Sequence, residues 1–332
     1  MRTKQWLAGV VMLFLAASAS ALDIKNTDVA AFIDTLVNED GLDRGMVEHA
    51  LTRARMRDDI IESISKPAER RLEWHDYRNI FIKPKRVVAG VEFWNEHAAT
   101  IDAVSQSTGV PPEILVGIIG VETYYGRITG KHRVLDSLAT LGFGYPPRSD
   151  FFRRELRTFF KLVAEEDIDL DTALGSYAGA MGRPQFIASS YLEYAVDTDG
   201  DGKRDLFDSW PDVIGSVANY FVRHRWQQGE PVVVPATLSA QHAIDIPKKN
   251  ARKTNTTVGT LRSGGASIDS QLSNDEAARL IAFVGEDGPE YYVGLKNFYV
   301  ITEYNHSAMY AMAVWQLGQA VAAERRTLIS QR

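Results

Sequence analysis

A single acidic residue closes an apolar run in the first half of the chain. Residues 116–126 (VGIIGVETYYG) contain one carboxyl group, Glu122, and a glycine follows it four positions later. Burial disfavours an ionised carboxyl group and raises its pKa, which keeps the group protonated near neutral pH and able to donate a proton. Glu122 is therefore a candidate general acid, and the alternative is a glutamate at a helix end that simply reaches water.

A second cluster of acids has the spacing of an EF-hand calcium loop. Residues 197–208 (DTDGDGKRDLFD) place acids at loop positions 1, 3, 5, 9 and 12 and a glycine at position 6. Crowded carboxylates repel one another unless a hard cation gathers them, and the glycine permits the bend that brings in the next carbonyl group. The predicted ligands are Asp197, Asp199, Asp201, the carbonyl of Lys203, Asp205 and Asp208.

The last ligand of this loop has two candidates. Asp208 stands where glutamate is usual, and its shorter side chain makes Asp212, in the first turn of the next helix, a rival. Arg204 occupies a position that is apolar where two EF-hands pair, which predicts a single structural site. We expect Ca²⁺ there, with Na⁺ or Mg²⁺ as alternatives, and no organic cofactor. A solvated acidic turn without metal is the competing interpretation.

A third segment interleaves small and polar residues. Residues 176–186 (SYAGAMGRPQF) combine glycine and alanine, which allow close backbone approach, with the polar groups of Ser176, Tyr177 and Gln185. Such mixtures bind sugars, because polar side chains orient hydroxyl and acetamido groups while aromatic faces cover the apolar faces of the rings. Plain helix packing through the small residues is the alternative.

The elements that must position these residues are mostly helices. From residue 22 to about 222 apolar residues recur three and four positions apart, with prolines and the Asp-rich loop as breaks. Further on, short apolar runs bounded by turn residues predict strands at 232–234, 280–284, 291–293 and 298–301. A final helix follows at about 307–329. The predicted fold class is α+β, predominantly α.

This pattern also suggests how the chain divides. From the pattern we expect an α-helical part up to about residue 222, a small β-rich domain at 231–305, and a final helix at 307–332 that packs back on the α-domain.

The first 21 residues have the features of a secretory signal peptide. Arg2 and Lys4 precede an apolar stretch at 6–17, and small residues up to Ala21 suit cleavage before Leu22. The stretch is shorter than the roughly 20 residues of a membrane helix. The chain has no cysteine to carry a lipid or a disulfide. We therefore expect a soluble periplasmic protein without a membrane anchor.

The charge balance argues against nucleic acid as a partner. Asp and Glu number 43 against 37 Lys and Arg, the formal net charge is -6, and most basic residues are interleaved with acids. A protein that binds a phosphate backbone presents a basic face instead. An uncharged polymer or sugar suits this chain better, and we expect a monomer.

Several long motifs, in this order, resemble the lytic murein transglycosylase B family. They are residues 116–130 (VGIIGVETYYGRITG), 135–148 (LDSLATLGFGYPPR), 176–186, the loop at 197–208, 214–221 (IGSVANYF) and 301–321 (ITEYNHSAMYAMAVWQLGQAV). The resemblance implies a lysozyme-like catalytic core at 91–230 with an added N-terminal α-domain at 22–90 and a small β-domain. It also implies a single EF-hand-like loop, which gives a metal loop at 197–212. It implies that Glu122 is the sole catalytic acid and base. The residues it places along the glycan cleft are Ser176, Gln185, Tyr220, Tyr304 and Asn305.

The resemblance further implies an activity. Glu122 protonates the β-1,4 glycosidic oxygen between N-acetylmuramic acid and N-acetylglucosamine of peptidoglycan and then acts as base, so that the muramoyl C6 hydroxyl forms a 1,6-anhydro end. Ordinary glycosidases use two carboxylates. The alternatives are a non-catalytic scaffold that binds murein and a lysozyme-type hydrolase. The expected partners are glycan strands, and other cell-wall enzymes are candidate partners.

Simpler roles remain open for several of these residues. Tyr220 is also explained by packing in an amphipathic helix. Asn305 is also explained as a helix N-cap beside a surface aromatic, Tyr304. His306 is expected to be a local hydrogen-bond partner rather than a metal ligand. Where the family often has Met-Pro, this chain has residues 187–188 (IA), which puts the shape of one cleft wall in doubt.

Overall fold

The computed structural model describes residues 20–66, 72–166, 168–269 and 271–331, and helices dominate it. The helices before residue 230 are α1 (Thr27–Asn38), α2 (Arg44–Thr52), α3 (Asp58–Ser65), α4 (Trp74–Phe81), α5 (Pro84–Glu96), α6 (Ala98–Thr108), α7 (Pro112–Thr123), α8 (Val134–Gly144), α9 (Ser149–Glu165), α10 (Ala188–Tyr194) and α11 (Trp210–Arg223). A 3-10 turn, η2 (Pro146–Arg148), joins α8 to α9. After residue 230 come α12 (Val258–Ser263), α13 (Lys296–Tyr304) and α14 (Ala308–Ser330). The helical character predicted for residues 22–222 is confirmed.

Local sequence signals explain where several helices begin. The side chain of Asp43 accepts the Met46 N–H at 2.8 Å at the start of α2, and Ser307 accepts the Tyr310 N–H at the start of α14. Pro112 occupies the first position of α7, where a backbone N–H would have no acceptor within the helix, so the missing N–H of proline costs no hydrogen bond.

The second half contains an antiparallel sheet of five strands. They are β5 (Val233–Leu238), β6 (Thr256–Thr257), β7 (Ala266–Ser267), β8 (Ala277–Val284) and β9 (Pro289–Gly294), in the order β6-β8-β9-β5-β7. Register pairs Val293 of β9 with Leu280 on one side and Val234 on the other. A separate small core under the sheet includes Val258, Leu261 and Leu280. The predicted strands at 232–234, 280–284 and 291–293 match β5, β8 and β9.

The predicted strand at 298–301 is wrong, because these residues lie in α13. All four side chains from Phe298 to Ile301 are buried in that helix. A short apolar run that is buried all round has no periodicity to distinguish a helix from a strand. The expected β-rich domain at 231–305 therefore ends as a sheet at Gly294, and α13 packs against α14 instead.

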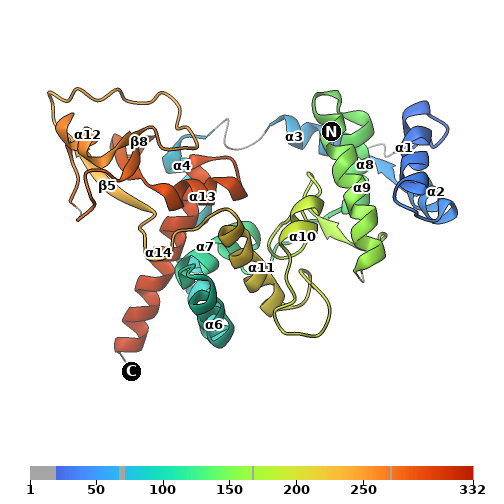
Figure 1. Ribbon diagram of the computed structural model, residues 1–332, viewed down its shortest axis with the longest axis horizontal. Helices are drawn as coiled ribbons and strands as arrows, with labels where there is room; N and C mark the ends of the chain where they lie inside the picture. Colours follow the sequence, from blue (N-terminus) through green and yellow to red (C-terminus); the bar gives the residue numbers. More distant parts are fainter. Residues whose placement is uncertain (1–19, 67–71, 167, 270, 332) are drawn as a thin grey trace, which may run out of the picture.

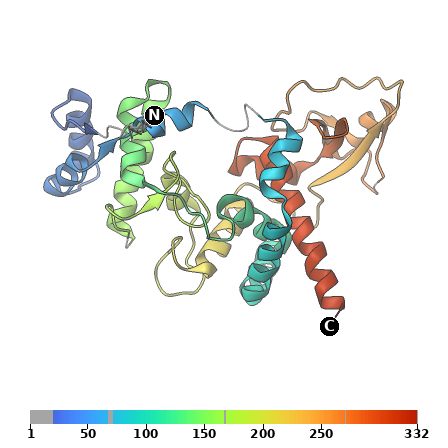
Figure 2. The ribbon, with the colours of Figure 1, turned by 180° about the vertical axis from the view of Figure 1, so that it is seen from behind.

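The helices form two groups (Figure 1). One group contains α1, α2, α3, α8 and α9, and the other contains α4 to α7, α11, α13 and α14, with the sheet beyond it. Within the second group α14 packs along α7 and also contacts α4, α5 and α13. Figure 2 shows the same separation from behind, with the C-terminal end of α14 projecting away from the sheet.

The structure divides residues 22–90 differently from the expected N-terminal domain. Helix α3 packs against α8, whereas α4 and α5 pack with α14. The final helix thus does return to residues within 22–90, but to their last two helices. Periodicity shows which face of an amphipathic helix is apolar and leaves its partner undefined, so the sequence did not show that α4 and α5 pack with α14.

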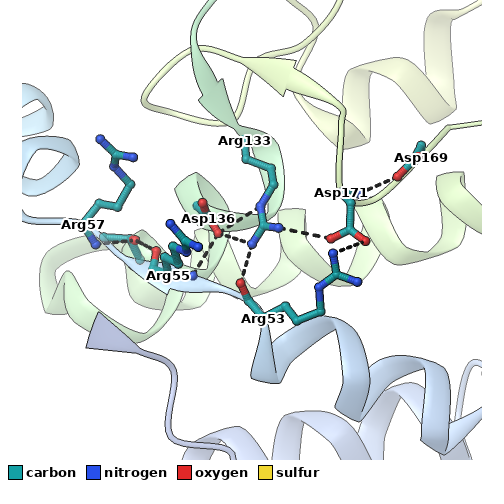
Figure 3. A network of polar contacts seen from close by, with 8 residues as sticks. Arg53, Arg55, Arg57, Arg133, Asp136, Asp169 and Asp171 are labelled. Carbon is teal, nitrogen blue, oxygen red and sulfur yellow. Dashed lines mark hydrogen bonds and ion pairs between the residues drawn. The ribbon is translucent and has the colours of Figure 1, made fainter. Parts of the chain in front are cut away.

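A buried polar network fastens the N-terminal helices to α8 (Figure 3). Asp136 is 5% exposed and accepts hydrogen bonds from the Arg55 N–H (2.9 Å) and the Arg133 guanidinium (2.6 Å). Arg133 also bonds Asp171 at 3.1 Å, and Arg53 pairs with the same carboxylate at 2.9 Å. The network joins β2 (Arg55–Met56) to the two-stranded antiparallel sheet of β3 (His132–Arg133) and β4 (Leu174–Gly175). Strand β4 leads directly into Ser176.

The predicted signal peptide falls mostly outside the described residues. Ser20 and Ala21 form β1, which pairs with Met56 and Arg55 of β2. Among the residues that the structure describes, no helix combines the length and the hydropathy needed to cross a membrane.

Candidate active site

Glu122 lies in the last turn of α7, a helix whose residues are mostly buried. Every residue from Ile114 to Val121 is buried, whereas Glu122 is half-buried. Gly117 allows α14 to approach closely, because a Cβ there would lie 2.5 Å from the Val314 carbonyl oxygen. The carboxyl group is thus held at the end of a rigid apolar helix, as predicted, and does not extend fully into water.

The chain turns sharply after Glu122. Tyr124 (φ 51°), Tyr125 (φ 59°) and Gly126 (φ 77°) are three consecutive left-handed residues, and two of them have side chains. Such conformations cost free energy and persist only where the surroundings enforce them. Thr123 helps to hold the turn in this conformation, because its hydroxyl accepts the Gly126 N–H and donates to the Arg183 carbonyl, both at 3.0 Å.

The ring of Tyr125 fills a slot between two glycines. A Cβ at Gly90 of α5 would lie 2.3 Å from the Tyr125 hydroxyl, and one at Gly120 of α7 would lie 2.7 Å from it. The ring also stacks on Phe93 with centroids 5.4 Å apart. The two glycines therefore let the side chain of Tyr125 anchor the turn that ends the helix bearing Glu122.

Tyr310 of α14 donates a hydrogen bond from its hydroxyl to Oε1 of Glu122. Tyr310 is 2% exposed, and burial followed by the negative charge of Glu122 raises the pKa of its phenol well above the usual value. The phenol therefore stays protonated and acts as a donor. Sequence analysis did not select Tyr310, although it lies within the motif at 301–321.

Tyr304 and Tyr220 extend this aromatic group. The rings of Tyr304 and Tyr310 are nearly parallel (13°), and their centroids lie 6.5 Å apart. The ring centroid of Tyr220 lies 4.8 Å from that of Tyr304. The Tyr304 hydroxyl donates to the Pro184 carbonyl and the Tyr220 hydroxyl to the Glu303 carbonyl, both at 2.7 Å. Tyr220 is only 7% exposed, so its ring is packed in the core as well as adjacent to Tyr304.

Gln185 and Ser176 lie in an irregular loop rather than in a helix. Gln185 has φ 53°, and its amide donates to the carbonyls of Thr129 and Gly182, both at 2.9 Å. The Ser176 hydroxyl accepts the N–H groups of Ala178 (3.2 Å) and Ala180 (3.1 Å). Gln185 thus ties this loop to the segment that follows the Glu122 turn, and the helix-packing interpretation of residues 176–186 is wrong.

Asn305 is exposed and lies in extended backbone between α13 and α14. The N-cap of α14 is Ser307, so the interpretation of Asn305 as that cap is wrong. His306 lies 3.1 Å from the Thr302 carbonyl through Nδ1, the local contact that was expected.

The acidic loop lies between α10 and α11 (Figure 1) and gathers three carboxylates. One oxygen from each of Asp197, Asp199 and Asp212 lies within 4.8 Å of the others. Asp212 is fully buried and accepts the N–H groups of Thr198 (2.7 Å) and Asp205 (2.8 Å), which lie at opposite ends of the loop. Burial raises the pKa of the Asp212 carboxyl.

Asp212, and not Asp208, lies with Asp197 and Asp199 in the structure. The Asp208 side chain is 88% exposed and lies 3.6 Å from Arg183. Asp197 accepts the N–H groups of Gly200 (2.7 Å) and Gly202 (2.8 Å), both of which have left-handed φ. The guanidinium of Arg204 pairs with Glu166. A cluster of hard oxygen donors around a buried carboxyl group is chemistry that suits a hard cation.

The other predicted ligands share hydrogen bonds within the loop. Asp201 accepts the Lys203 N–H at 2.8 Å, and Asp205 accepts the N–H groups of Phe207 (2.8 Å) and Asp208 (2.9 Å). These bonds set the loop backbone, and Asp201 and Asp205 lie outside the cluster of three carboxylates.

Comparison with known proteins decides the family. The family model described as the transglycosylase SLT domain matches residues 25–319. The chain belongs to this family. The chain is 44% identical over 309 residues to membrane-bound lytic murein transglycosylase B of Escherichia coli strain K12. The aligned region covers 90% of this chain and 84% of the relative.

Two solved structures agree with the family assignment. Soluble lytic transglycosylase SltB1 from Pseudomonas aeruginosa is 46% identical, with a TM-score of 0.84 over 90% of this chain and 99% of that one. Escherichia coli lytic transglycosylase Slt35 in complex with calcium is 44% identical, with a TM-score of 0.84 over 92% of this chain and 96% of that one. The protein is an enzyme with the lysozyme-like transglycosylase fold, and it cleaves peptidoglycan.

Proposed function

We propose that this transglycosylase cleaves the β-1,4 bond between N-acetylmuramic acid and N-acetylglucosamine with Glu122 as the sole acid and base. The hydrogen bond from Tyr310 to Oε1 of Glu122 carries the proposal, because it orients the carboxyl group at the end of α7. It also stabilises the carboxylate that forms when Glu122 gives up its proton.

The reaction balances without water. Glu122 protonates the glycosidic oxygen, the bond from that oxygen to C1 breaks, and positive charge develops on the muramoyl ring. The muramoyl C6 hydroxyl then attacks C1 and returns its proton to Glu122, which restores the enzyme. The product carries a 1,6-anhydromuramoyl end, and one residue serves as acid and then as base.

The proposed glycan cleft is lined by Ser176, Gln185, Tyr220, Tyr304 and Asn305. Its best-supported member is Tyr304, because its ring neighbours Tyr310 and its hydroxyl holds the Pro184 carbonyl. The replacement of the family's Met-Pro by residues 187–188 (IA) should change the shape of the proposed cleft wall only slightly. Ala188 is the first residue of α10, a position where proline and alanine both start a helix, so the wall keeps its backbone path.

We further propose that residues 197–212 hold one structural Ca²⁺ in an EF-hand-like loop, with Na⁺ or Mg²⁺ as weaker candidates. Asp197, Asp199 and Asp212 supply the gathered oxygens, and Asp201, the Lys203 carbonyl and Asp205 complete the proposed set. The complex of the related Slt35 with calcium supports this choice. The ion supports the cleft through Arg183, whose guanidinium donates to the Asp208 carbonyl at 2.6 Å and whose carbonyl accepts from Thr123.

We also propose that the enzyme works as an unanchored monomer in the periplasm, where its glycan-strand substrate and other cell-wall enzymes are found. The proposed signal peptide and the absence of cysteine support this location. Fractionation of cells that express the full chain tests it: the protein should leave with the periplasmic contents and not with the membranes.

Replacing Glu122 tests the mechanism directly. Glu122→Gln cannot donate a proton, so the variant should release no soluble fragments from purified murein sacculi while keeping the wild-type thermal unfolding temperature. Glu113→Gln, in the first turn of the same helix, is the matched control and should keep full activity. Substantial lysis by Glu122→Gln would refute the assignment.

The products distinguish this function from its two rivals. Mass spectrometry should find anhydro ends, which are lighter by one water than the reducing ends left by a lysozyme-type hydrolase. A non-catalytic scaffold would pellet with sacculi and release no fragments.

A further inference from the structure

We propose that Arg183 is a positioning residue that couples the metal loop at 197–212 to the turn that holds Glu122, so that an ion in the loop raises kcat. This inference rests on the proposed function, because it assigns regulation to the same site. Arg183 lies in the irregular loop at 176–186, and its side chain is only 19% exposed.

The side chain of Arg183 is fastened to the end of the metal loop. Its guanidinium donates to the Asp208 carbonyl at 2.6 Å and lies 4.3 Å from the ring centroid of Trp210, the first residue of α11. The Asp208 carboxylate contributes little, because it is 88% exposed and lies 3.6 Å from the guanidinium. A guanidinium suits this place, since its flat face covers an aromatic ring while its edge donates hydrogen bonds.

The backbone of Arg183 connects the same loop to the Glu122 turn. Its N–H donates to the Leu206 carbonyl at 2.9 Å, and its carbonyl accepts from the Thr123 hydroxyl at 3.0 Å. Leu206 and Thr123 are both buried. A buried hydrogen bond is costly to break, because the freed group cannot turn to water. One residue therefore holds the metal loop on one side and the neighbour of Glu122 on the other.

The turn also packs directly against the contacts of the Arg183 side chain. A Cβ at Gly126 would lie 2.9 Å from the Trp210 ring and 3.5 Å from Cδ of Arg183. The Thr123 hydroxyl accepts the Gly126 N–H at 3.0 Å as well. A shift of Trp210 or of the Asp208 carbonyl is therefore passed to the turn by direct contact.

The gathered carboxylates of the loop allow an ion to act on this segment. Asp212 lies in the same first turn of α11 as Trp210, and one of its oxygens lies within 4.8 Å of oxygens from Asp197 and Asp199. Like charges at this distance repel one another, and a cation among them removes the repulsion. The start of α11 should therefore be more ordered with the ion bound, and Arg183 passes that order to the turn.

The experiment compares three arginine variants with and without metal. Arg183→Met removes the guanidinium, and Arg183→Lys keeps a positively charged donor beside Trp210. Arg153→Met is the matched control, because the Arg153 guanidinium also donates to a carbonyl, that of Gly142, at 3.0 Å and lies 5.5 Å from the ring centroid of Phe143. Calorimetry gives Tm, and release of anhydro ends from soluble glycan strands gives kcat and KM, each with Ca²⁺ and with a chelator.

In wild type the chelator should lower both Tm and kcat. Arg183→Met should keep the gain in Tm that Ca²⁺ gives, because Arg183 supplies no ligand. Its kcat with Ca²⁺ should fall about 10-fold with KM nearly unchanged, since a misplaced acid costs rate rather than affinity, and the chelator should lower it little further. Arg183→Lys should recover most of kcat, and Arg153→Met should match wild type in kcat and in its dependence on Ca²⁺.

Three outcomes would overturn the inference: a wild-type kcat in Arg183→Met, a kcat in that variant that falls under chelation as steeply as in wild type, and an equal loss in Arg153→Met. If Arg183→Met does not fold, Thr123→Val cuts the link from the side of the turn and must give the same loss of metal dependence.

The wild type separates this inference from the proposed function. If it forms anhydro ends and gains Tm with Ca²⁺, yet keeps its kcat under chelation, the coupling is wrong and the proposed function stands. If Ca²⁺ gives no gain in Tm, the proposed metal site is wrong and the coupling falls with it.

Discussion

The hydroxyl of Tyr310 donates to Oε1 of Glu122 across 188 residues of sequence. The contact joins the last turn of α7 to the first turn of α14, the two helices that pack most extensively on each other. The orientation of the proposed acid therefore depends on the packing of this helix pair.

Tyr310→Phe removes the donor and keeps the ring. We expect kcat to fall about 10- to 100-fold with little change in KM, because the lost hydrogen bond stabilises the carboxylate formed during the reaction. Steady-state kinetics on soluble glycan strands measure this. Tyr125→Phe is the matched control, because its buried hydroxyl has no hydrogen-bond partner among the described residues. Comparable losses in both variants would point to general disruption of packing.

Gly120→Ala tests the slot that holds the turn. The added Cβ would lie 2.7 Å from the Tyr125 hydroxyl, so either the ring or the turn must shift. We expect a loss of about 1–3 kcal/mol in the free energy of unfolding together with lower activity. Urea denaturation gives the first value. Gly45→Ala in α2, where the nearest atom, Oδ1 of Asp43, would lie 3.2 Å from the added Cβ, should cost much less. An unchanged Gly120→Ala protein would refute the role of the slot.

Asp212→Asn should abolish most of the stabilisation by Ca²⁺, whereas Asp208→Asn should leave it nearly intact. Asp212 is buried beside Asp197 and Asp199, and the Asp208 side chain faces solvent. An ion at 100 times its Kd raises the free energy of unfolding by about 2.7 kcal/mol. Calorimetry with Ca²⁺ and with a chelator measures the difference in Tm. A larger effect in Asp208→Asn would show that Asp208 closes the occupied loop.

Acid should weaken the contact between the α1–α2 loop and α9. Hydrogen bonds from Arg157, and secondarily from Lys161, lower the pKa of Asp40, whose side chain is 3% exposed. A group whose pKa is lowered by folding stabilises the protein above its unfolded pKa, here 3.8, and loses this effect as the pH falls through the folded value.

Asp40→Asn should therefore cost about 1–3 kcal/mol at pH 7 and progressively less below pH 4. Urea denaturation across this pH range provides the comparison. Asp34→Asn breaks an exposed pair with Arg44 and should change stability by less than about 1 kcal/mol at any pH. A constant cost for Asp40→Asn down to pH 2 would contradict the assigned role.

Local sequence patterns were enough to predict much of the secondary structure of this protein. Apolar periodicity predicted the helices of residues 22–222, and three short apolar runs predicted β5, β8 and β9. The apolar run at 116–126 predicted a buried helix that ends near Glu122, and the acidic spacing at 197–208 predicted a loop that gathers carboxylates. Each of these features depends on residues a few positions apart, whose conformations are coupled through the backbone.

Other features were set by contacts between distant segments. The apolar run at 298–301 became a helix because α14 and its neighbours bury it on all sides, and α4 and α5 joined α14 instead of α1 to α3. Asp212, rather than Asp208, lies with Asp197 and Asp199 because the start of α11 packs against the loop and buries the Asp212 side chain there. Tyr310 met Glu122 only through the packing of α14 on α7.

By itself, then, the sequence determined which segments are helical, which acid ends a buried helix and which loop gathers carboxylates. Tertiary structure alone decided which side chain contacts that acid and which buried carboxylate lies with Asp197 and Asp199. Short-range backbone preferences act within one element, whereas these choices arise when apolar faces bury one another and bring side chains from separate elements within hydrogen-bonding distance.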